Sequence, residues 1–411
     1  MSNNKSILSL IFNVIFFGKI QTCVTIITTI NNGEIMGKTK RLFLSIVSIL
    51  ILSVCILCGC RPTPKEKPDI NIDASTEVKN LIYIIGDGMG SNHIANTKTY
   101  YNKTFNFEQY YVTDITTYSR NDTVTDSAAA GTALATGKKT DNGVISRIDK
   151  KDVTNLMEVA RSKNKRTGVV TTDYLSGATP ACFSAHANNR GDKDDIIKCQ
   201  YGSNIDLLIG KQDTQYYVEK YGENFKANGY DIYTDYNSLK TADKNHKVLA
   251  SLDGLYSQYT PGLTNTTNYS QLLEFVLDYM DYNNENGFCL MIEEAYIDKN
   301  SHNNNILGMM SAMMNIGEGI DYILDWCKDR TDTAIIFTAD HETGKLDKAN
   351  TRKEIDDSLN SKQTLSSLYH KKSHTDRNVP LYLYNINFTY DNDKTVDNTQ
   401  VYDIAYSLIT K

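Results

Sequence analysis

Short apolar runs alternate with amphipathic stretches along the chain from about residue 78 to the end. Apolar runs of about four to eight residues are typical of buried strands, whereas apolar positions three and four apart are typical of helices. Because alternating strands and helices favour a parallel sheet covered on both faces, residues 78–411 are predicted to form an α/β domain with a mostly parallel central sheet. Strands are expected at 81–85, 167–172, 288–292, 333–338 and 379–384. Helices are expected at 127–136, 153–163, 306–326 and 401–409, with a further one ending near Tyr100.

Two segments depart from this pattern. Residues 200–285 are rich in Tyr and Asn and have weaker periodicity, which predicts a peripheral insertion. Residues 60–77 are polar and contain Pro62, Pro64 and Pro68, a composition typical of a tether.

The region before the tether, residues 1–59, is predicted to be a targeting segment. Basic residues after Met36 precede an apolar run, 42–57, and then Cys58-Gly59-Cys60, an order typical of a bacterial lipoprotein signal over 36–59. We expect a lipid anchor at Cys60; the alternative is an uncleaved signal-anchor helix. Residues 1–35 lack a comparable basic start, and we hypothesise that translation begins at Met36. In either case the domain is expected to be exported and tethered at the outer face of the cell membrane, in an extracellular or periplasmic location.

The charge of the chain excludes some classes of partner. With Lys+Arg 43 against Asp+Glu 49, the formal net charge is -6, and the basic residues of the targeting segment leave the domain still more acidic. Nucleic-acid binding usually needs a basic excess, so a nucleic-acid scaffold is not expected. An acidic domain repels an anionic substrate unless a bound cation reverses the local field.

Carboxylates and imidazoles follow several of the predicted strands. Asp87 follows the strand 81–85, Glu293 follows 288–292, and Asp340-His341 follow 333–338. Ligands collect at the carboxyl ends of parallel strands, so these side chains are expected to lie together. Imidazole with carboxylate suits zinc, and carboxylates with hydroxyls suit magnesium. Asp298 and His302 come shortly after Glu293, and His374 precedes the predicted strand 379–384; the whole set would suffice for two or three ions.

Ser127 begins the small-residue helix 127–136, where backbone amides favour an anion. A serine there is by itself more often an ordinary helix cap than a nucleophile. Arg190 would by default be a surface arginine.

The order of these motifs resembles that of alkaline phosphatases from about residue 78 to 411, apart from the 200–285 region. The resemblance rests on six ordered segments: Ile85-Gly86-Asp87-Gly88-Met89-Gly90, Asp126-Ser127-Ala128, Ala178-Thr179-Pro180-Ala181 through Arg190, Glu293 through Asp298-Lys299 to His302, Thr338-Ala339-Asp340-His341, and Ser373-His374-Thr375.

The resemblance implies hydrolysis of small-molecule phosphate monoesters through a phosphoserine on Ser127, with Arg190 holding the phosphate and Lys299 close to it. It implies two zinc ions and one magnesium ion, and the possibility of a homodimer. The implied ligands are Asp298, His302 and His374 for one zinc, Asp87, Asp340, His341 and Ser127 for the other, and Asp87, Thr179 and Glu293 for magnesium.

The chain departs from the family pattern at Gly177, where an acid or a histidine beside the magnesium site is usual. Lys299 is therefore expected to lack its usual acidic partner, which puts magnesium occupancy in doubt. Glu294 replaces a usually small residue, and the sequence offers no account of it. Among the other histidines, His93 and His246 are expected to be solvated.

Two rival functions remain open at this stage. One is a phosphodiesterase or sulfatase of the same superfamily, against which Ser127 and Arg190 together argue. The other is a metal-binding or phosphate-binding lipoprotein without catalysis, against which the intact nucleophile argues. The natural substrate cannot be read from the sequence.

Replacing Cys60 with Ser should release or mislocalise the protein without changing the kinetics of the domain. Each buried lipid methylene contributes about 0.8 kcal/mol, so loss of the acyl chains removes the anchor. Membrane fractionation combined with a phosphatase assay tests this. A variant that stays as membrane-bound as the wild type would indicate an uncleaved helix instead of a lipid anchor.

Overall fold

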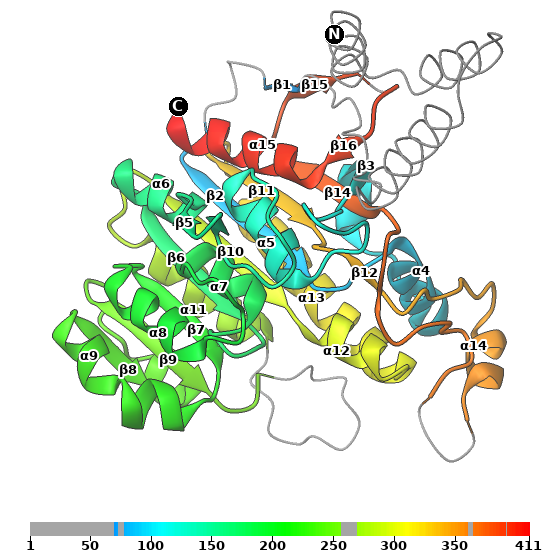
Figure 1. Cartoon of the computed structure of the whole chain (residues 1–411), viewed down its shortest axis with the longest axis horizontal. Helices are drawn as coiled ribbons and strands as arrows, with labels where there is room; N and C mark the ends of the chain where they lie inside the picture. The colour runs from blue at the N-terminus through cyan, green and yellow to red at the C-terminus, as the bar shows by residue number, and fades with distance from the viewer. Residues whose placement is uncertain (1–69, 73–77, 256–268, 361–364, 392) are drawn as a thin grey trace, which may run out of the picture. The chain divides into compact units, whose positions relative to one another are not determined.

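The structure is a computed structural model, and it describes residues 70–72, 78–255, 269–360, 365–391 and 393–411 (Figure 1). Its centre is a ten-stranded sheet in which most neighbouring strands run parallel. The predicted α/β class with a mostly parallel sheet is therefore confirmed. The strand order is β16 (Val396–Asp397), β3 (Tyr111–Thr116), β14 (Val379–Tyr384), β11 (Thr333–Thr338), β2 (Asn80–Gly86), β10 (Phe288–Glu294), β6 (Arg166–Thr171), β7 (Leu207–Lys211), β9 (Lys247–Leu252) and β8 (Tyr230–Tyr233).

The middle of the sheet is buried on both faces. Every residue of β2, β10 and β11 is buried, which is why these strands read as continuous apolar runs in the sequence. β2 lies between the other two, and Ile85 pairs with Glu293 on one side and with Thr338 on the other. The three strands therefore end at the same level, and the residues that follow them emerge together.

Helices cover both faces of the sheet (Figure 1). One group contains α5 (Ser127–Thr136), α6 (Leu156–Ser162), α7 (Ala178–Ser184) and α15 (Asn398–Thr410). A second contains α4 (Ser91–Tyr101), α11 (Tyr269–Asp281), α12 (Tyr296–His302) and α13 (Ile306–Cys327). The remaining helices are η1 (Asn106–Tyr110), α8 (Lys193–Gly202), η2 (Thr214–Lys220), α9 (Gly222–Ala227), α10 (Tyr236–Leu239) and α14 (Arg352–Ser358).

The predicted elements are present, and several of their boundaries are set by caps. The helix expected from residue 153 begins only at Leu156, because the Asn155 side chain accepts hydrogen bonds from the amides of Met157 and Glu158. The closing helix begins earlier than expected, at Asn398, because Asp397 caps it. Cys289 and Cys327 are buried free thiols, as predicted.

The segment 200–285 continues the central sheet. Its strands β7, β9 and β8 extend the sheet parallel to β6 at one edge. Two of its tyrosines, Tyr217 and Tyr230, are buried and pack against Phe225.

Smaller sheets lie outside the main one. Ile70–Ile72, within the predicted tether, forms β1 and pairs antiparallel with β15 (Phe388–Tyr390). The other two-stranded sheets pair β4 (Arg147–Ile148) with β5 (Lys151–Asp152) and β12 (Glu342–Thr343) with β13 (His374–Thr375).

The signal, Cys60 and the rest of the tether lie outside the described residues. Among the helices that are described, none has the length and apolarity needed to cross a bilayer.

Candidate active site

The predicted ligand residues converge beyond the carboxyl ends of β2, β10 and β11. Asp87 directly follows β2, Glu293 is the penultimate residue of β10, and Asp340 follows β11 after one residue. The turn after β2 needs a glycine at residue 88, because φ there is +74° and a Cβ would lie 2.8 Å from the Cα of Asp298. The amide of Gly88 donates to Asp340 Oδ1 at 3.0 Å, which ties the two strand ends together.

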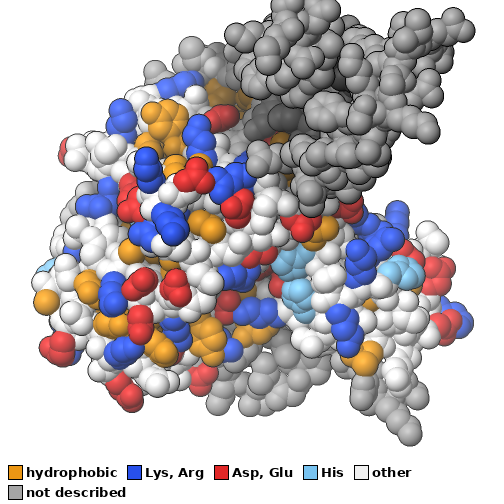
Figure 2. All heavy atoms as spheres, viewed as in Figure 1, with side chains coloured by type: hydrophobic (Ala, Val, Ile, Leu, Met, Phe, Trp, Pro, Cys, Tyr) orange, Lys and Arg blue, Asp and Glu red, His pale blue; other side chains and the backbone are white. Residues whose placement is uncertain are grey.

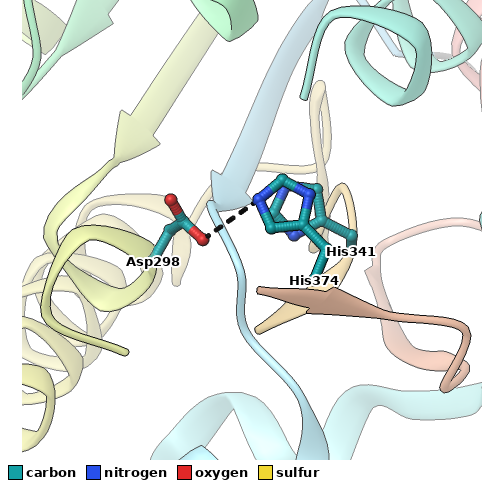
Figure 3. Close-up of side chains that lie close together, drawn as sticks. All are labelled: Asp298, His341 and His374. Carbon is teal, nitrogen blue, oxygen red and sulfur yellow. Dashed lines mark ion pairs between the residues drawn. The ribbon is translucent and has the colours of Figure 1, made fainter. Parts of the chain in front are cut away.

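Candidate ligand atoms form two groups that share His341. One group is Asp298, His341 and His374, and the other is Asp87, Asp340 and His341; within each, the ligand atoms lie within 4.8 Å of one another. Figure 3 shows the first group, in which the rings of His341 and His374 stack with centroids 3.5 Å apart.

His302, on α12, joins the same cluster. Its Nε2 lies 3.3 Å from Asp298 Oδ1 and 3.1 Å from Nε2 of His374. In Figure 2, histidine side chains reach the surface near the middle of the viewed face, beside Lys or Arg side chains.

Each of these three imidazoles is fixed through its Nδ1 atom. Nδ1 of His302 lies 2.7 Å from the Lys372 carbonyl oxygen, and Nδ1 of His374 lies 2.9 Å from the carbonyl oxygen of Thr125. Nδ1 of His341 lies 3.2 Å from the Thr343 hydroxyl. A neutral imidazole that donates from Nδ1 presents a lone pair at Nε2, and here the Nε2 atoms face one another and a carboxylate. Such an arrangement repels itself unless a proton or a metal ion lies between the lone pairs.

The buried carboxylates resist ionisation without a cation. Burial, with the charges of Asp340 and Asp298 nearby, raises the pKa of Asp87 well above its usual value. Burial likewise raises the pKa of Asp340 to about 7 and that of Glu293 to about 8. Burial lowers the pKa of His341 well below its usual value.

Asp298 behaves differently from the other carboxylates. Burial acts to raise its pKa, but the hydrogen bond with His302 and the nearby His341 and His374 bring the pKa below its usual value. The same hydrogen bond raises the pKa of His302.

The donor set fits bound metal ions. Asp87 Oδ1, Thr179 Oγ1 and Asp340 Oδ2 are buried and have no hydrogen-bond partner among the described residues. Burying a polar atom without a partner costs free energy of folding, and bound cations would give each of these three atoms a partner. Oxygen and imidazole donors in this combination suit zinc, and the oxygen donors alone suit magnesium.

Ser127 lies at the start of α5 with its hydroxyl directed at the cluster. The oxygen is 3.2 Å from Nε2 of His341, and the side chain is buried. The preceding residue, Asp126, caps the helix: its Oδ1 accepts from the amide of Ala129 at 2.9 Å. Because Asp126 supplies the cap, the Ser127 hydroxyl is left to face the site.

Arg190 reaches the same helix start. Its Nη1 donates to Asp126 Oδ2 at 3.1 Å, and that oxygen also accepts from the amide of Gly143. The Arg190 side chain is 41% exposed, so its guanidinium can still meet a ligand from solvent. Arg190 is thus a surface arginine, as its sequence context suggests by default, and it is also paired with Asp126 at the helix start.

Lys299 has an acidic partner, contrary to the expectation from Gly177. Its ammonium pairs with Asp173, which lies in the loop after β6. Contact between these two residues depends on how the loop after β6 packs against α12, so nothing in the local pattern of either indicated it.

The expectation that His93 is solvated was wrong; it rested on the polar character of the helix in which His93 lies. It is fully buried and not solvated: its Nδ1 accepts from the amide of Gly90 at 3.1 Å, and its Nε2 lies 3.1 Å from the hydroxyl of Ser301. Ser301 precedes His302 on α12, so His93 helps to hold the helix that carries two candidate ligands. His246 is exposed beside Asp231, as predicted.

Glu294, for which the sequence offered no account, links three elements from a buried position. It accepts hydrogen bonds from Thr172 at 2.9 Å, from Asn315 at 2.7 Å and from the amide of Tyr296 at 3.0 Å. It thereby joins the loop after β6 to the beginning of α12 and to α13.

Comparison with known proteins agrees with this geometry. The sequence family described as alkaline phosphatase matches residues 78–207 and 210–405, which includes most of the segment 200–285. The chain is 31% identical to alkaline phosphatase 4 of Bacillus subtilis over 337 residues, covering 76% of this chain and 71% of that protein.

Solved structures show the same fold. The cold-active alkaline phosphatase of the psychrophile Shewanella sp. superposes with a TM-score of 0.70 at 26% identity, covering 81% of this chain and 100% of that one. The alkaline phosphatase of the Antarctic bacterium TAB5 gives a TM-score of 0.67 at 25% identity, covering 81% of this chain and 98% of that one.

The metal-free protein should become less stable as the pH rises from about 6.5, where unfolded histidines have largely lost their protons, to about 8. Asp340 and Glu293 keep their protons in the folded protein up to pKa values of about 7 and about 8, whereas unfolded carboxyls lose them near pH ~4. The folded state therefore binds more protons in this range, and its free energy of unfolding falls as those protons leave. Thermal unfolding of chelator-treated protein measures this effect.

Zinc should restore the melting temperature more at pH 8 than at pH 5, because at the lower pH the metal competes with bound protons. Glu293→Gln, which removes one titrating group, should flatten the pH dependence of the metal-free protein. A melting temperature that rises between pH ~6.5 and pH ~8 without metal would contradict the assignment of these buried acids.

Proposed function

The chain belongs to the alkaline phosphatase family, and from that premise we propose that it hydrolyses phosphate monoesters through a phosphoserine formed on Ser127. Its relatives and structural neighbours make it a phosphatase of a metal-dependent family. The observation that carries the proposal is the direction of the Ser127 hydroxyl, which faces His341 across 3.2 Å at the start of α5. This hydroxyl adjoins both groups of candidate ligands, since His341 belongs to both.

In the proposed reaction the Ser127 oxygen attacks the phosphorus of the substrate. A bond forms between that oxygen and phosphorus, the ester bond from phosphorus to the substrate oxygen breaks, and the alcohol leaves. The alcohol takes the proton that Ser127 gives up. Water then attacks the phosphoserine, one proton of the water passes to the Ser127 oxygen, and inorganic phosphate is released. The overall reaction consumes one water and needs no other reactant.

Residues of this chain would bind the phosphoryl group in both steps. The start of α5 offers the positive end of the helix dipole to an anion. Arg190 offers two parallel N–H groups that match two phosphate oxygens. Asp126 holds Arg190 near that helix start through its Oδ2 atom.

We propose three metal sites, in which Asp87 would serve two. When bound, the metal ions would favour ionisation of Ser127 and neutralise charge on the phosphate and leaving oxygens. One zinc would be held by Asp298, His302 and His374, the second by Asp87, Asp340, His341 and Ser127, and a magnesium by Asp87, Thr179 and Glu293.

We also propose that the substrates are small molecules that reach the protein outside the cytoplasm. Attachment through Cys60 and assembly as a homodimer belong to the same proposal. Ser127 together with Arg190 favours a monoesterase over a diesterase or sulfatase of the same superfamily. An aryl phosphate assay separates a working enzyme from a protein that only binds metal or phosphate.

Ser127→Ala should lower kcat by about a thousandfold or more, because removing the nucleophile of a serine enzyme has at least this effect. Metal content should stay near that of the wild type, since the His and Asp ligands remain. The matched control is Ser91→Ala, which alters an exposed serine that begins α4 as Ser127 begins α5, and it should keep full activity. Phosphate label trapped by acid on a residue other than Ser127 would overturn the proposal.

Chelation should abolish activity, and zinc should restore it better than magnesium alone. Three of the proposed ligands are imidazoles, which favour zinc, whereas magnesium prefers shells of oxygen only. Elemental analysis of the reactivated protein provides the second measurement. Active protein that contains only magnesium or calcium would show the two-zinc assignment to be wrong.

A further inference from the structure

The Asp173–Lys299 ion pair lies beside the carboxylate of Glu293. β6 is the parallel neighbour of β10, and Thr171 pairs in register with Glu293, so the loop after β6 emerges next to that carboxylate. The Thr171 hydroxyl donates to Glu293 and accepts from the amide of Asp173 at 2.8 Å. Asp173 is thus fixed to the site through its backbone, and its side chain is free to pair with Lys299.

The position of Asp173 is fixed from two further directions. Its carbonyl oxygen accepts from the amide of Lys211, at the end of β7, at 2.7 Å. The chain then turns back on itself, where the amide of Gly177 donates to the carbonyl of Tyr174 at 2.7 Å. A short loop with both ends held cannot move its acidic side chain far from Lys299.

Gly177 makes room for this carboxylate. The residue has φ −58° and ψ 156°, a conformation open to any amino acid, so a glycine is not required by its backbone. A Cβ at this position would lie 2.7 Å from Asp173 Oδ2 and 2.9 Å from the Tyr174 carbonyl oxygen. The space beside Lys299 therefore holds either a side chain at residue 177 or the carboxylate of Asp173 in its present place.

A fixed carboxylate partner restricts the rotamers of the Lys299 side chain before a ligand binds. It follows Asp298 on α12, and its side chain is 39% exposed while that of Asp173 is 17% exposed. An unpaired lysine samples many rotamers, and fixing it on a ligand costs side-chain entropy. A lysine already held by a carboxylate has lost most of that freedom before the ligand arrives.

We propose that Asp173 is a positioning residue for phosphate binding, which holds the Lys299 ammonium in place beside Glu293. The proposal rests on the proposed function, because it takes the ligand of Lys299 to be phosphate or the phosphoryl group of the substrate. Asp173 takes over the space that a side chain at residue 177 would occupy, and it acts on phosphate through Lys299.

A double-mutant cycle on full-length protein tests this directly. Asp173→Ala should weaken competitive inhibition by inorganic phosphate about tenfold, the size expected when one charge-assisted hydrogen bond loses its fixed donor. It should raise KM for an aryl phosphate by a similar factor and change kcat less. In the Lys299→Ala background the same substitution should change phosphate inhibition less than about twofold, because interacting residues are non-additive.

Two further variants complete the test. Asp173→Asn keeps the size of the side chain and removes its charge, and it should weaken phosphate inhibition to an intermediate degree while folding normally. Asp213→Ala breaks a neighbouring ion pair with Lys193, 2.5 Å long, and should leave phosphate inhibition unchanged.

Equal effects of Asp173→Ala in the wild-type and Lys299→Ala backgrounds would overturn the proposal, and so would no effect in either. These outcomes are distinct from a failure of the proposed function, in which the wild-type protein would not hydrolyse the aryl phosphate. In that event calorimetric titration of the same variants with inorganic phosphate still measures the coupling, and its absence would also overturn the proposal.

Discussion

Burial of several carboxylates close to one another, at the ends of β2, β10 and β11, is the constraint around which the site is built, and their mutual repulsion adds to the cost of burial. Asp87, Glu293 and Asp340 are buried together, and the pKa of each is raised by its surroundings. Three imidazoles nearby aim their Nε2 atoms at the same region. Removing so many acceptors from water is strongly unfavourable unless cations compensate them. The rest of the fold holds these groups in place against that repulsion.

The sheet supplies the rigidity for this task. β2, β10 and β11 are buried on both faces and end in register, so the attached side chains have little freedom to separate. Smaller contacts fix the orientation of individual groups, such as the carbonyl of Thr125 behind His374 and the amide of Gly88 on Asp340. The same arrangement prepares the protein to bind phosphate, because cations placed there turn an acidic region into an attractive one for an anion.

Local pattern was enough to predict five of the ten strands of the central sheet, β2, β6, β10, β11 and β14, together with several long helices and the residues at the strand ends. It did not predict β7, β9 and β8, because the periodicity of the segment 200–285 is weak. Contacts between residues far apart in the sequence could not be predicted in this way. Asp173 meets Lys299 only because the turn before α7 folds back at Gly177, and nothing near either residue in the sequence indicates this. The burial of His93 was missed for a similar reason, since its partner Ser301 is distant in the sequence and its own helix is largely polar.

Anomalous diffraction at the zinc edge from crystals of zinc-loaded protein would test the role of the buried ligands most directly. We expect two strong anomalous peaks about 4 Å apart, the spacing typical of paired catalytic metals. One should lie among Asp298, His302 and His374, and the other among Asp87, Asp340 and His341. Carboxylates and imidazoles found in these same positions with no anomalous peak between them would contradict the account.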